Sequence, residues 1–518
     1  MASGIGITCE MQWVVWRQVF SVRGRSRFSN FAAMKAYIVR ELRPDWPIVW
    51  LTSPRAAEQQ KAILANHGLS SELLPMERRL TFYRDGVREG LQIVLPDDGV
   101  ETLRRGVYYA LRKAEEVGWH QVQLRWIEPP QLHDRAYAYQ SLGELAVMSL
   151  YRFTRYVVEP IPTVEEVTIF APESEAEKAL EKGLIIGKAV NRTRDWVNEP
   201  PNIMTAVGLA EHIQVLGQTY NFRVEVWDKA RIQAEKMGGL LAVNQGSMLP
   251  PTFTIAEYRP AQARNKKPIV LVGKGLVFDT GGLSLKPTTD SMDYMKVDMA
   301  GGAVMANVIA AAAELALPYH LIALVPATDN RPGENAYTPN DIIYVSDGTP
   351  VEIRNTDAEG RLILADALVH ARRYDPALVV DAATLTGAAA LAVGPYASAF
   401  FTNAGSLVRE GFLESGFRTY ERLVEFPLWE EYGYLIKSDI AAIKNSAGRE
   451  GGAITAAKFL EYFVCYPWVH LDIAGTAYYN KPLPPDRGFP RHYQVKYATG
   501  VGVRLLLDFI ERYADRLG

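Results

Sequence analysis

Two segments of the sequence carry side chains whose types and spacing could do chemistry. One is the glycine-rich stretch 273–298, which contains several acidic and basic side chains, and the other is residues 355–362 (NTDAEGRL), which contribute two acids and an arginine. The candidate side chains are Lys274, Asp279, Lys286, Asp298, Asp357, Glu359 and Arg361. Four carboxylates in one dry cleft repel one another unless cations neutralise them. Two divalent ions would balance four carboxylates, so the pattern predicts a two-metal site.

The spacing within the second segment suggests how two carboxylates converge. Asp357 and Glu359 are two residues apart, and in an extended segment such side chains point to the same side. Gly360 would then allow a sharp turn into the helix expected to follow. The sequence therefore predicts that this acidic pair lies in an extended segment.

The basic residues would complete such a centre. An ammonium group among divalent cations has its pKa pushed down, so we expect Lys274 to act as a neutral amine ligand. Lys286 and Arg361 would stay positive. These two charges could stabilise the oxyanion that develops during attack on a carbonyl, and they could hold an anion that acts as a base or orients the reacting groups. Ordinary surface ion pairs would explain any one of these residues, but not their ordered combination. The glycines around Lys274 match neither a dinucleotide fingerprint nor a P-loop, and the eight histidines include no H-E-x-x-H.

Alternating apolar runs and helical patterns would position these groups. Short unbroken apolar runs are typical of buried parallel strands, and ligands bind beyond the carboxyl ends of such strands. We expect strands at 47–53, 79–83, 91–95, 121–126, 164–170, 268–272, 320–325, 351–354, 378–382 and 469–473. We expect helices at 55–67, 100–117, from 174 onward, 300–315, 362–370 and 454–464. This alternation predicts an α/β fold with a mixed, mainly parallel central sheet flanked by helices.

The chain length predicts more than one domain, because single cores rarely grow past roughly 250–300 residues. We expect an N-terminal extension at 1–33, a smaller N-terminal α/β domain at 34–172 and a larger C-terminal α/β catalytic domain at 173–518, with the helix after 172 as the linker. Residues 11–40 contain six basic side chains and no acid. That composition weakly resembles a transit peptide, although an extension upstream of a start at Met34 is the favoured interpretation.

Composition excludes several classes of protein. Lys plus Arg number 56 against 59 Asp plus Glu, a net charge of -3, so there is no general electrostatic reason to bind nucleic acid or an anionic membrane. The uncharged stretch 382–408 is diluted by Thr, Gly, Pro, Ser and Asn, which favours a buried strand and loop over a membrane span. Cys9 and Cys465 form no disulfide framework and fit a reducing compartment. We expect a cytoplasmic protein, or an organellar one if residues 1–33 are a transit peptide.

The sequence resembles the cytosol (leucyl) aminopeptidase family, whose members are di-metal exopeptidases. The octapeptide NTDAEGRL is the signature of that family and is highly specific. Further matching segments lie at 197–205, 272–287, 295–303, 326–341, 383–388, 452–460 and 468–477. In all the resemblance spans about residues 185–518, whereas the N-terminal part matches only in its α/β pattern and position.

The resemblance implies roles for individual residues. One metal would be held by Lys274, Asp279, Asp298 and Glu359, and the other by Asp279, Asp357 and Glu359. The ions would be zinc or manganese, with magnesium and cobalt as alternatives. A bridging water would attack, Lys286 would stabilise the oxyanion, and Arg361 would hold a bicarbonate as general base.

The resemblance also implies the substrate and the assembly. Peptides with N-terminal Leu, Met or another bulky apolar residue would be cut, and the protein would be a homohexamer. The first subsite would be lined by Met295, Thr384, Gly387, Ala474 and Ala477. Two departures from the family pattern leave the ligands in place: the loop at 288–291 is one residue longer than usual, and Asp329-Asn330 replaces Glu-Asn.

Two other functions compete with the peptidase interpretation. A two-metal phosphoesterase would use the same kind of centre, but a lysine ligand and the whole octapeptide argue against it. A DNA-binding or scaffold role of the hexamer would need a basic surface, and only residues 17–40 are markedly basic. We therefore expect no nucleic-acid and no membrane partner.

Overall fold

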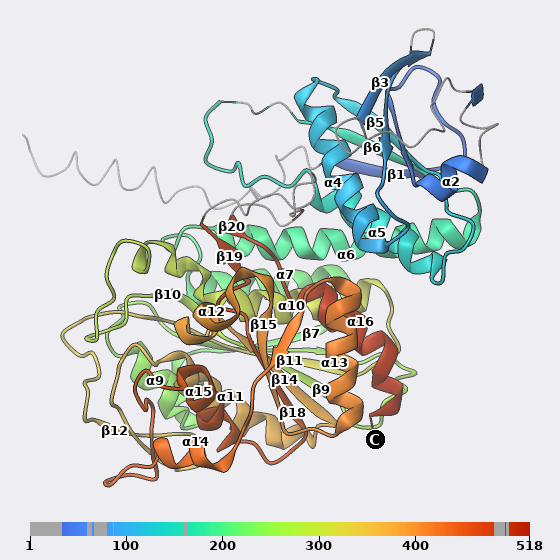
Figure 1. Ribbon diagram of the computed structural model, residues 1–518. Helices are drawn as coiled ribbons and strands as arrows, with labels where there is room; N and C mark the ends of the chain where they lie inside the picture. Colours follow the sequence, from blue (N-terminus) through green and yellow to red (C-terminus); the bar gives the residue numbers. More distant parts are fainter. Residues whose placement is uncertain are drawn as a thin grey trace, which may run out of the picture.

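The computed structural model describes residues 34–59, 65–66, 80–85, 88–159, 161, 163–480, 493 and 497–517. Two separate β-sheets organise these residues, a smaller one built from the first part of the chain and a larger one built from the second (Figure 1). The extension expected at 1–33, with its transit-peptide alternative and Cys9, lies outside the described residues.

The first sheet has six strands in the order β1-β6-β5-β2-β4-β3. Neighbouring strands are parallel except β3, which is antiparallel to β4. The strands are β1 (Lys35–Val39), β2 (Ile48–Thr52), β3 (Leu80–Asp85), β4 (Arg88–Val94), β5 (Gln121–Trp126) and β6 (Glu166–Phe170). The helices of this part are α2 (Pro54–Gln59), α4 (Val100–Glu116) and α5 (Arg135–Met148). Every residue of β2 is buried, as expected for an unbroken apolar run in the middle of a parallel sheet.

The second sheet has nine strands in the order β16-β15-β18-β14-β9-β11-β8-β7, with β10 paired to β11. Its centre is parallel from β18 to β11, and antiparallel pairs lie toward both edges. The strands are β7 (Arg223–Trp227), β8 (Thr252–Tyr258), β9 (Ile269–Gly273), β10 (Gly275–Asp279), β11 (Leu321–Asn330), β14 (Leu378–Ala383), β15 (Ser398–Thr402), β16 (Leu423–Glu425) and β18 (Trp468–Asp472). This arrangement confirms the predicted mixed, mainly parallel sheet.

Helices cover both faces of the larger sheet, and short strands lie outside it. On one face pack α6 (Ser174–Asn198), α7 (Ala206–Tyr220), α10 (Ala300–Glu314), α13 (Ser406–Thr419) and α16 (Val503–Tyr513). On the other pack α8 (Lys229–Ala234), α9 (Gly238–Asn244), α11 (Gly360–Ala371) and α15 (Gly452–Glu461). The remaining elements are η3 (Met292–Met299), η4 (Arg372–Tyr374), α12 (Gly387–Val393), η5 (Gly394–Tyr396), α14 (Glu430–Leu435), η6 (Ala514–Arg516), β12 (Ile342–Tyr344), β13 (Pro350–Glu352), β17 (Ile443–Lys444), β19 (Tyr478–Tyr479) and β20 (Tyr497–Ala498).

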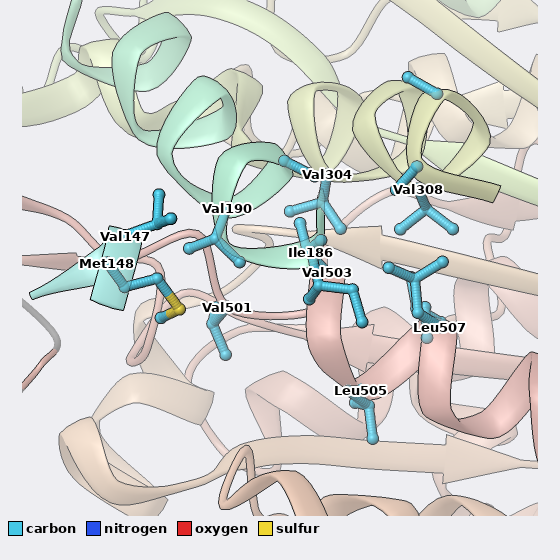
Figure 2. Close-up of a cluster of buried hydrophobic side chains, with 14 of the residues drawn as sticks. Val147, Met148, Ile186, Val190, Val304, Val308, Val501, Val503, Leu505 and Leu507 are labelled. Carbon is cyan, nitrogen blue, oxygen red and sulfur yellow. The ribbon is translucent and has the colours of Figure 1, made fainter. Parts of the chain in front are cut away.

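The apolar core is continuous between the two sheets. Figure 2 shows side chains of α5, α6, α10 and α16 meeting in one cluster, in which Met148, Ile186, Val304 and Leu507 are buried. The helices α5 and α6 approach so closely that a Cβ added at Gly183 would lie 2.0 Å from the carbonyl oxygen of Gln140. The boundary near 172 remains a prediction, because α6 packs against both parts of the molecule.

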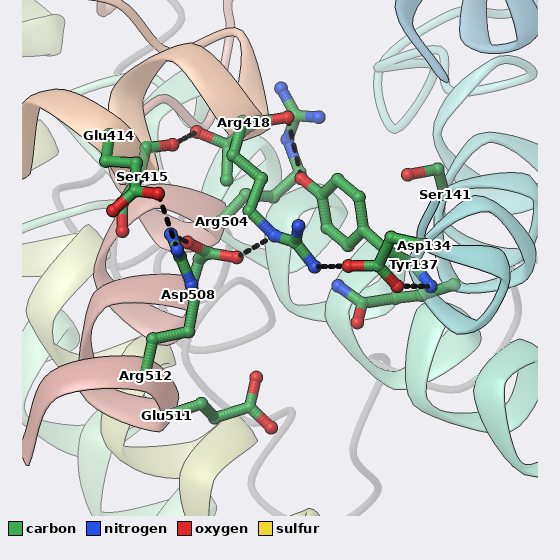
Figure 3. A network of polar contacts seen from close by, with 12 residues as sticks. Asp134, Tyr137, Ser141, Glu414, Ser415, Arg418, Arg504, Asp508, Glu511 and Arg512 are labelled. Carbon is green, nitrogen blue, oxygen red and sulfur yellow. Dashed lines mark hydrogen bonds and ion pairs between the residues drawn. The ribbon is translucent and has the colours of Figure 1, made fainter. Parts of the chain in front are cut away.

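A polar network also joins the two parts (Figure 3). Arg418 on α13 donates through Nη2 to Asp134 Oδ2 at 2.6 Å and through Nε to Asp508 Oδ1 at 2.9 Å. Its carbonyl oxygen accepts a hydrogen bond from the Tyr137 hydroxyl at 2.8 Å. Asp134 is the N-cap of α5 and accepts from the Tyr137 amide. One arginine therefore connects the start of α5 to α16.

One stretch, Met292–Glu314, is long and apolar enough by composition to cross a membrane, and 89% of its apolar window is buried inside the protein. It comprises η3 and α10, and it packs against β9, β11 and β14. The stretch 382–408, which raised the same question in the sequence, contains the end of β14 and all of β15. Between these strands lie the short helices α12 and η5, where a loop was expected, and Leu391 of α12 is 90% exposed. Met292–Glu314 and the strands of 382–408 therefore serve the core of the larger sheet, whereas α12 lies at its surface.

Candidate metal centre

The acidic cluster lies where strands of the larger sheet end. Lys274 directly follows β9, Asp279 ends β10, and Asn330 ends β11. Asp298 comes from η3 and Glu359 from the residue before α11. The expectation that polar groups gather at the carboxyl ends of the strands is met.

Three carboxylates converge in the interior. Ligand oxygens of Asp279, Asp298 and Glu359 all lie within 4.8 Å of one another. These residues are only 1%, 3% and 1% exposed. Burial raises the pKa of the Asp298 and Glu359 carboxyl groups, and for Glu359 the charge of Asp279 adds to the effect. Buried charges of one sign need cations at short range.

Lys274 supplies one such positive charge. Its Nζ lies 2.9 Å from Asp298 Oδ2 and 2.9 Å from Glu359 Oε1, and it donates to the carbonyl oxygen of Thr384 at 3.1 Å. Burial opposes its charge, but the carboxylates outweigh burial and raise the pKa of the ammonium. The neutral amine predicted from the sequence thus depends on divalent cations replacing these ion pairs.

The segment before α11 forms a turn and not the extended segment that the spacing suggested. Asp357 lies in a turn closed by its amide, which donates to the Asn355 side chain at 2.9 Å. Glu359 has helical angles, φ -81° and ψ -36°. Glu359 points into the buried cluster, whereas the Asp357 side chain, which is 32% exposed, meets the cluster from its more open side through Lys286. Local hydrogen bonding of an asparagine decided the conformation here.

Gly360 also has another role than the predicted one. It is the first residue of α11, and it is not one of the glycines with a positive φ in the described part of the chain. A Cβ at this position would lie 2.4 Å from Lys274 Nζ and 2.5 Å from its Cε. The glycine therefore makes room for the lysine that faces Glu359.

Lys286 lies between the buried cluster and Asp357. Its Nζ is 2.8 Å from Asp279 Oδ2 and forms an ion pair with Asp357 Oδ1. The carboxylates raise the pKa of its ammonium despite burial. Burial and the charge of Glu359 raise the pKa of Asp357 to about 7. Asp357 thus joins the centre through Lys286, at its more open side.

Arg361 stands in the first turn of α11 beside the cluster. Its Nη1 donates to the carbonyl oxygen of Asn445 at 2.7 Å, while its buried Nε has no hydrogen-bond partner. Burial lowers the pKa of the guanidinium to about 10. A buried cation with a free donor is suited to holding an anion.

The donor set fits divalent cations. Glu359 Oε2 is a buried oxygen that finds no hydrogen-bond partner among the described residues, and burying such an oxygen costs free energy unless a cation or donor meets it. Carboxylate oxygens with one amine nitrogen suit zinc, manganese, magnesium or cobalt. The seven predicted metal and catalytic residues thus gather in one place.

The predicted subsite residues lie around the same edge. Thr384 donates through Oγ1 to Asp298 Oδ1 at 2.7 Å, and a Cβ at Gly387 would meet nothing within 4 Å. Met295 and Ala474 are half-buried, whereas Ala477 is only 3% exposed and belongs to the apolar core. Their role as a pocket remains a prediction.

Two residues near the centre were given no role in the sequence analysis. Asn330 donates through Nδ2 to Asp279 Oδ1 at 2.8 Å. Asp472, at the end of β18, accepts from the amides of Leu385 and Ala474 at 3.1 Å each and from Thr386 Oγ1 at 2.7 Å. Both are polar residues at strand ends, and that position was the available signal.

Comparisons with known proteins agree with this centre. The model of the catalytic domain of the cytosol aminopeptidase family matches residues 191–507. The chain is 43% identical over 383 residues to a probable cytosol aminopeptidase of Roseiflexus castenholzii, covering 72% of this chain and 76% of that protein. It is 43% identical over 422 residues to the one of Syntrophotalea carbinolica, covering 79% and 82%.

Solved structures show the same fold. The bottromycin maturation enzyme BotP in complex with Mn superimposes with a TM-score of 0.80 at 30% identity, over 91% of this chain and 100% of that chain. A point mutant of tomato leucine aminopeptidase superimposes with a TM-score of 0.79 at 25% identity, over 93% and 97%.

Proposed function

Because the chain belongs to the cytosol aminopeptidase family and is a metal-dependent aminopeptidase, we propose that it releases N-terminal Leu, Met and other bulky apolar residues from peptides with two divalent ions per subunit. The observation that carries this proposal is the convergence of three buried carboxylates within 4.8 Å beside Lys274. A structural ion-pair cluster would not leave Glu359 Oε2 without a partner.

The proposal assigns a role to each residue of the centre. Lys274, Asp279, Asp298 and Glu359 would hold one ion and Asp279, Asp357 and Glu359 the other, with Asp279 and Glu359 shared. Such ions lower the pKa of water and polarise a carbonyl. Lys286 stands beside both Asp279 and Asp357, where its ammonium can stabilise the negative charge that develops on the carbonyl oxygen.

Arg361 orients the base. Its free Nε and remaining donors can hold a bicarbonate, which would accept the proton of the attacking water. Asn445, which accepts from Arg361, also accepts from the amides of Arg354 and Asn355. That fixed carbonyl and side chain keep the guanidinium close to the metal ligands.

The remaining parts of the proposal concern context. We place the protein in the cytoplasm, in keeping with the name of its relatives, and as a homohexamer that acts on peptides. A two-metal phosphoesterase is the second candidate, since paired ions serve phosphate esters as well. Absence of turnover on p-nitrophenyl phosphate by the metal-loaded protein would exclude it.

Chelation tests the proposal. Removing divalent ions should abolish hydrolysis of leucyl-amide substrates, and adding manganese, zinc or cobalt should restore it, because the ligands offer oxygen and neutral nitrogen donors. The readout is turnover of leucine p-nitroanilide before and after metal is added back, with metal content measured in parallel. Full activity in a verified metal-free preparation would contradict the two-metal account.

A further inference from the structure

A cavity lies in the N-terminal part of the molecule, away from the metal centre. It has a volume of about 520 Å³ and opens beyond the carboxyl ends of β5 and β6, with Arg125, Glu128, Leu132, Arg135, Tyr139 and Phe170 in its lining. Small-molecule sites typically measure about 300–1,000 Å³. Parallel α/β sheets bind their ligands beyond this edge.

Arg125 is the unusual group in this cavity. Its guanidinium carbon lies 5.0 Å from the centre of the Trp50 ring and 4.4 Å from that of Phe170. The side chain is partly buried, and burial lowers the pKa of its guanidinium. Within the part of the chain that the structure describes, this guanidinium has no hydrogen-bond acceptor and no carboxylate partner. Two aromatic rings thus hold a cation whose five donors are unused.

The other charges of the cavity are already compensated. Arg135 donates to Glu128 through Nε at 2.5 Å and through Nη2 at 2.8 Å, and it also pairs with Glu173. Glu128 accepts a further hydrogen bond from Tyr139. The carboxylate of the lining is therefore occupied, and Arg125 contributes an uncompensated positive charge. Leu132 and Phe170 provide apolar wall beside it.

We propose that this cavity binds a small organic anion, with a carboxylate or phosphate group against Arg125 and a flat apolar body against Phe170 and Leu132. The arginine fork matches either oxyanion in a bidentate manner. A ligand that also carries an ammonium group is disfavoured, because both oxygens of Glu128 already accept from Arg135. None of the lining residues belongs to the metal centre, so the site is independent of peptide hydrolysis.

Calorimetric titration of the metal-loaded full chain tests this site with four probes. Benzoate and phenyl phosphate carry an oxyanion on a flat ring, benzamide is a neutral analogue of benzoate, and inorganic phosphate lacks the ring. At least one of the first two should bind at least about tenfold more tightly than benzamide and inorganic phosphate. Whichever of the two binds better identifies the carboxylate or the phosphate as the preferred group.

Two variants locate the binding. Arg125→Gln should weaken binding of the better probe at least about tenfold and leave leucine p-nitroanilide turnover unchanged. The control is Arg55→Gln, whose side chain is 73% exposed and pairs with Asp98 at 3.6 Å outside the cavity lining; it should bind as the unaltered protein does. The proposal would be overturned if benzamide bound as tightly as the better of the two ring anions, if neither ring anion bound, or if binding persisted in a folded Arg125→Gln protein. If Arg125→Gln does not fold, the comparison of benzamide with the better ring anion still tests the proposal on the unaltered protein.

Discussion

Lys286 contacts Asp279 and Asp357 from the more open side of the metal centre. Lys286→Ala should lower kcat by roughly two to three orders of magnitude, the usual cost of removing one oxyanion donor. The metal content should stay unchanged, because Lys286 is not among the proposed ligands. Steady-state kinetics together with elemental analysis of the purified variant check both statements. Loss of metal would instead make Lys286 part of the ligand set.

We expect Asp472 to position the predicted subsite, because its carboxylate joins the loop after β14 to the loop after β18. In Asp472→Asn the amide group would face donors, and about one charge-assisted hydrogen bond would be lost, roughly 1.5–3 kcal/mol. We expect KM for N-terminal Leu and Met substrates to rise about tenfold or more, with a smaller change in kcat and unchanged metal content.

A panel of aminoacyl-coumarin substrates measures this effect. In the unaltered protein, substrates with N-terminal Leu or Met should have the highest kcat/KM. A substrate with an acidic N-terminal residue should have a lower value, because its carboxylate would be desolvated without a partner. A Gly substrate should lose roughly 0.8 kcal/mol of binding free energy per missing methylene. In Asp472→Asn the differences in kcat/KM between the Leu or Met substrates and the acidic or Gly substrates should become smaller. An unchanged ranking would mean that Asp472 does not position the subsite, and a ranking led by acidic residues would contradict the pocket itself.

The sequence predicted residue identities at the centre better than residue conformations. The signature octapeptide and the glycine-rich segment were sufficient to name Lys274, Asp279 and Glu359. The turn at Asp357 and the need for Gly360 could not be predicted, because they depend on an asparagine side chain and on a lysine that is distant in sequence. Contacts between distant segments leave no periodic signal in one chain.

At the scale of elements, the contact between α5 and α6 sets the tightest packing near the junction. Gly183→Ala would place a methyl group 2.0 Å from the carbonyl oxygen of Gln140, so the helices would have to separate. Although alanine favours an exposed helix by up to about 1 kcal/mol over glycine, overpacking here should cost about 3 kcal/mol or more. Thermal unfolding followed by circular dichroism should show a lower Tm.

The matched control is Glu181→Ala, two residues away on the exposed face of α6. Its Tm should stay within about 1 °C of the unaltered protein, since surface substitutions usually change stability by less than about 0.5 kcal/mol. A Gly183→Ala protein as stable as this control would show that the helices separate at little cost.

Short apolar runs were predictable as strands, whereas several helices were missed, including α16 (Val503–Tyr513) despite its clear apolar face. The strands β2, β5, β9 and β14 follow their apolar runs closely. The helix α5 was not predicted, because nearly all its residues are buried and it lacks a polar face that would reveal a helical period. The helix expected at 55–67 is described as α2 only to Gln59, and most of the rest lies outside the described residues.

At the scale of the whole molecule, the proposed assembly is a homohexamer. Exposed aromatic and aliphatic side chains include Trp429 at 64%, Ile440 at 67% and Leu391 at 90%, which gives subunits apolar surface to bury. Light scattering at working concentration should give six times the subunit mass. A mass of 57.8 kDa, that of a single chain, would contradict the assembly.

The continuous core has a consequence for the synthesis of the protein. The apolar side chains of α6 that meet α16 are translated long before their partner, since α16 starts roughly 300 residues after α6 ends, an interval on the order of tens of seconds at about 5–20 residues per second. During this interval the growing polypeptide displays Ile186 without Val503 of α16, which lies beside it in the folded protein (Figure 2). We therefore expect nascent chains of this protein to depend on chaperones until α16 has been translated, because apolar surface that the folded protein buries stays exposed up to that point.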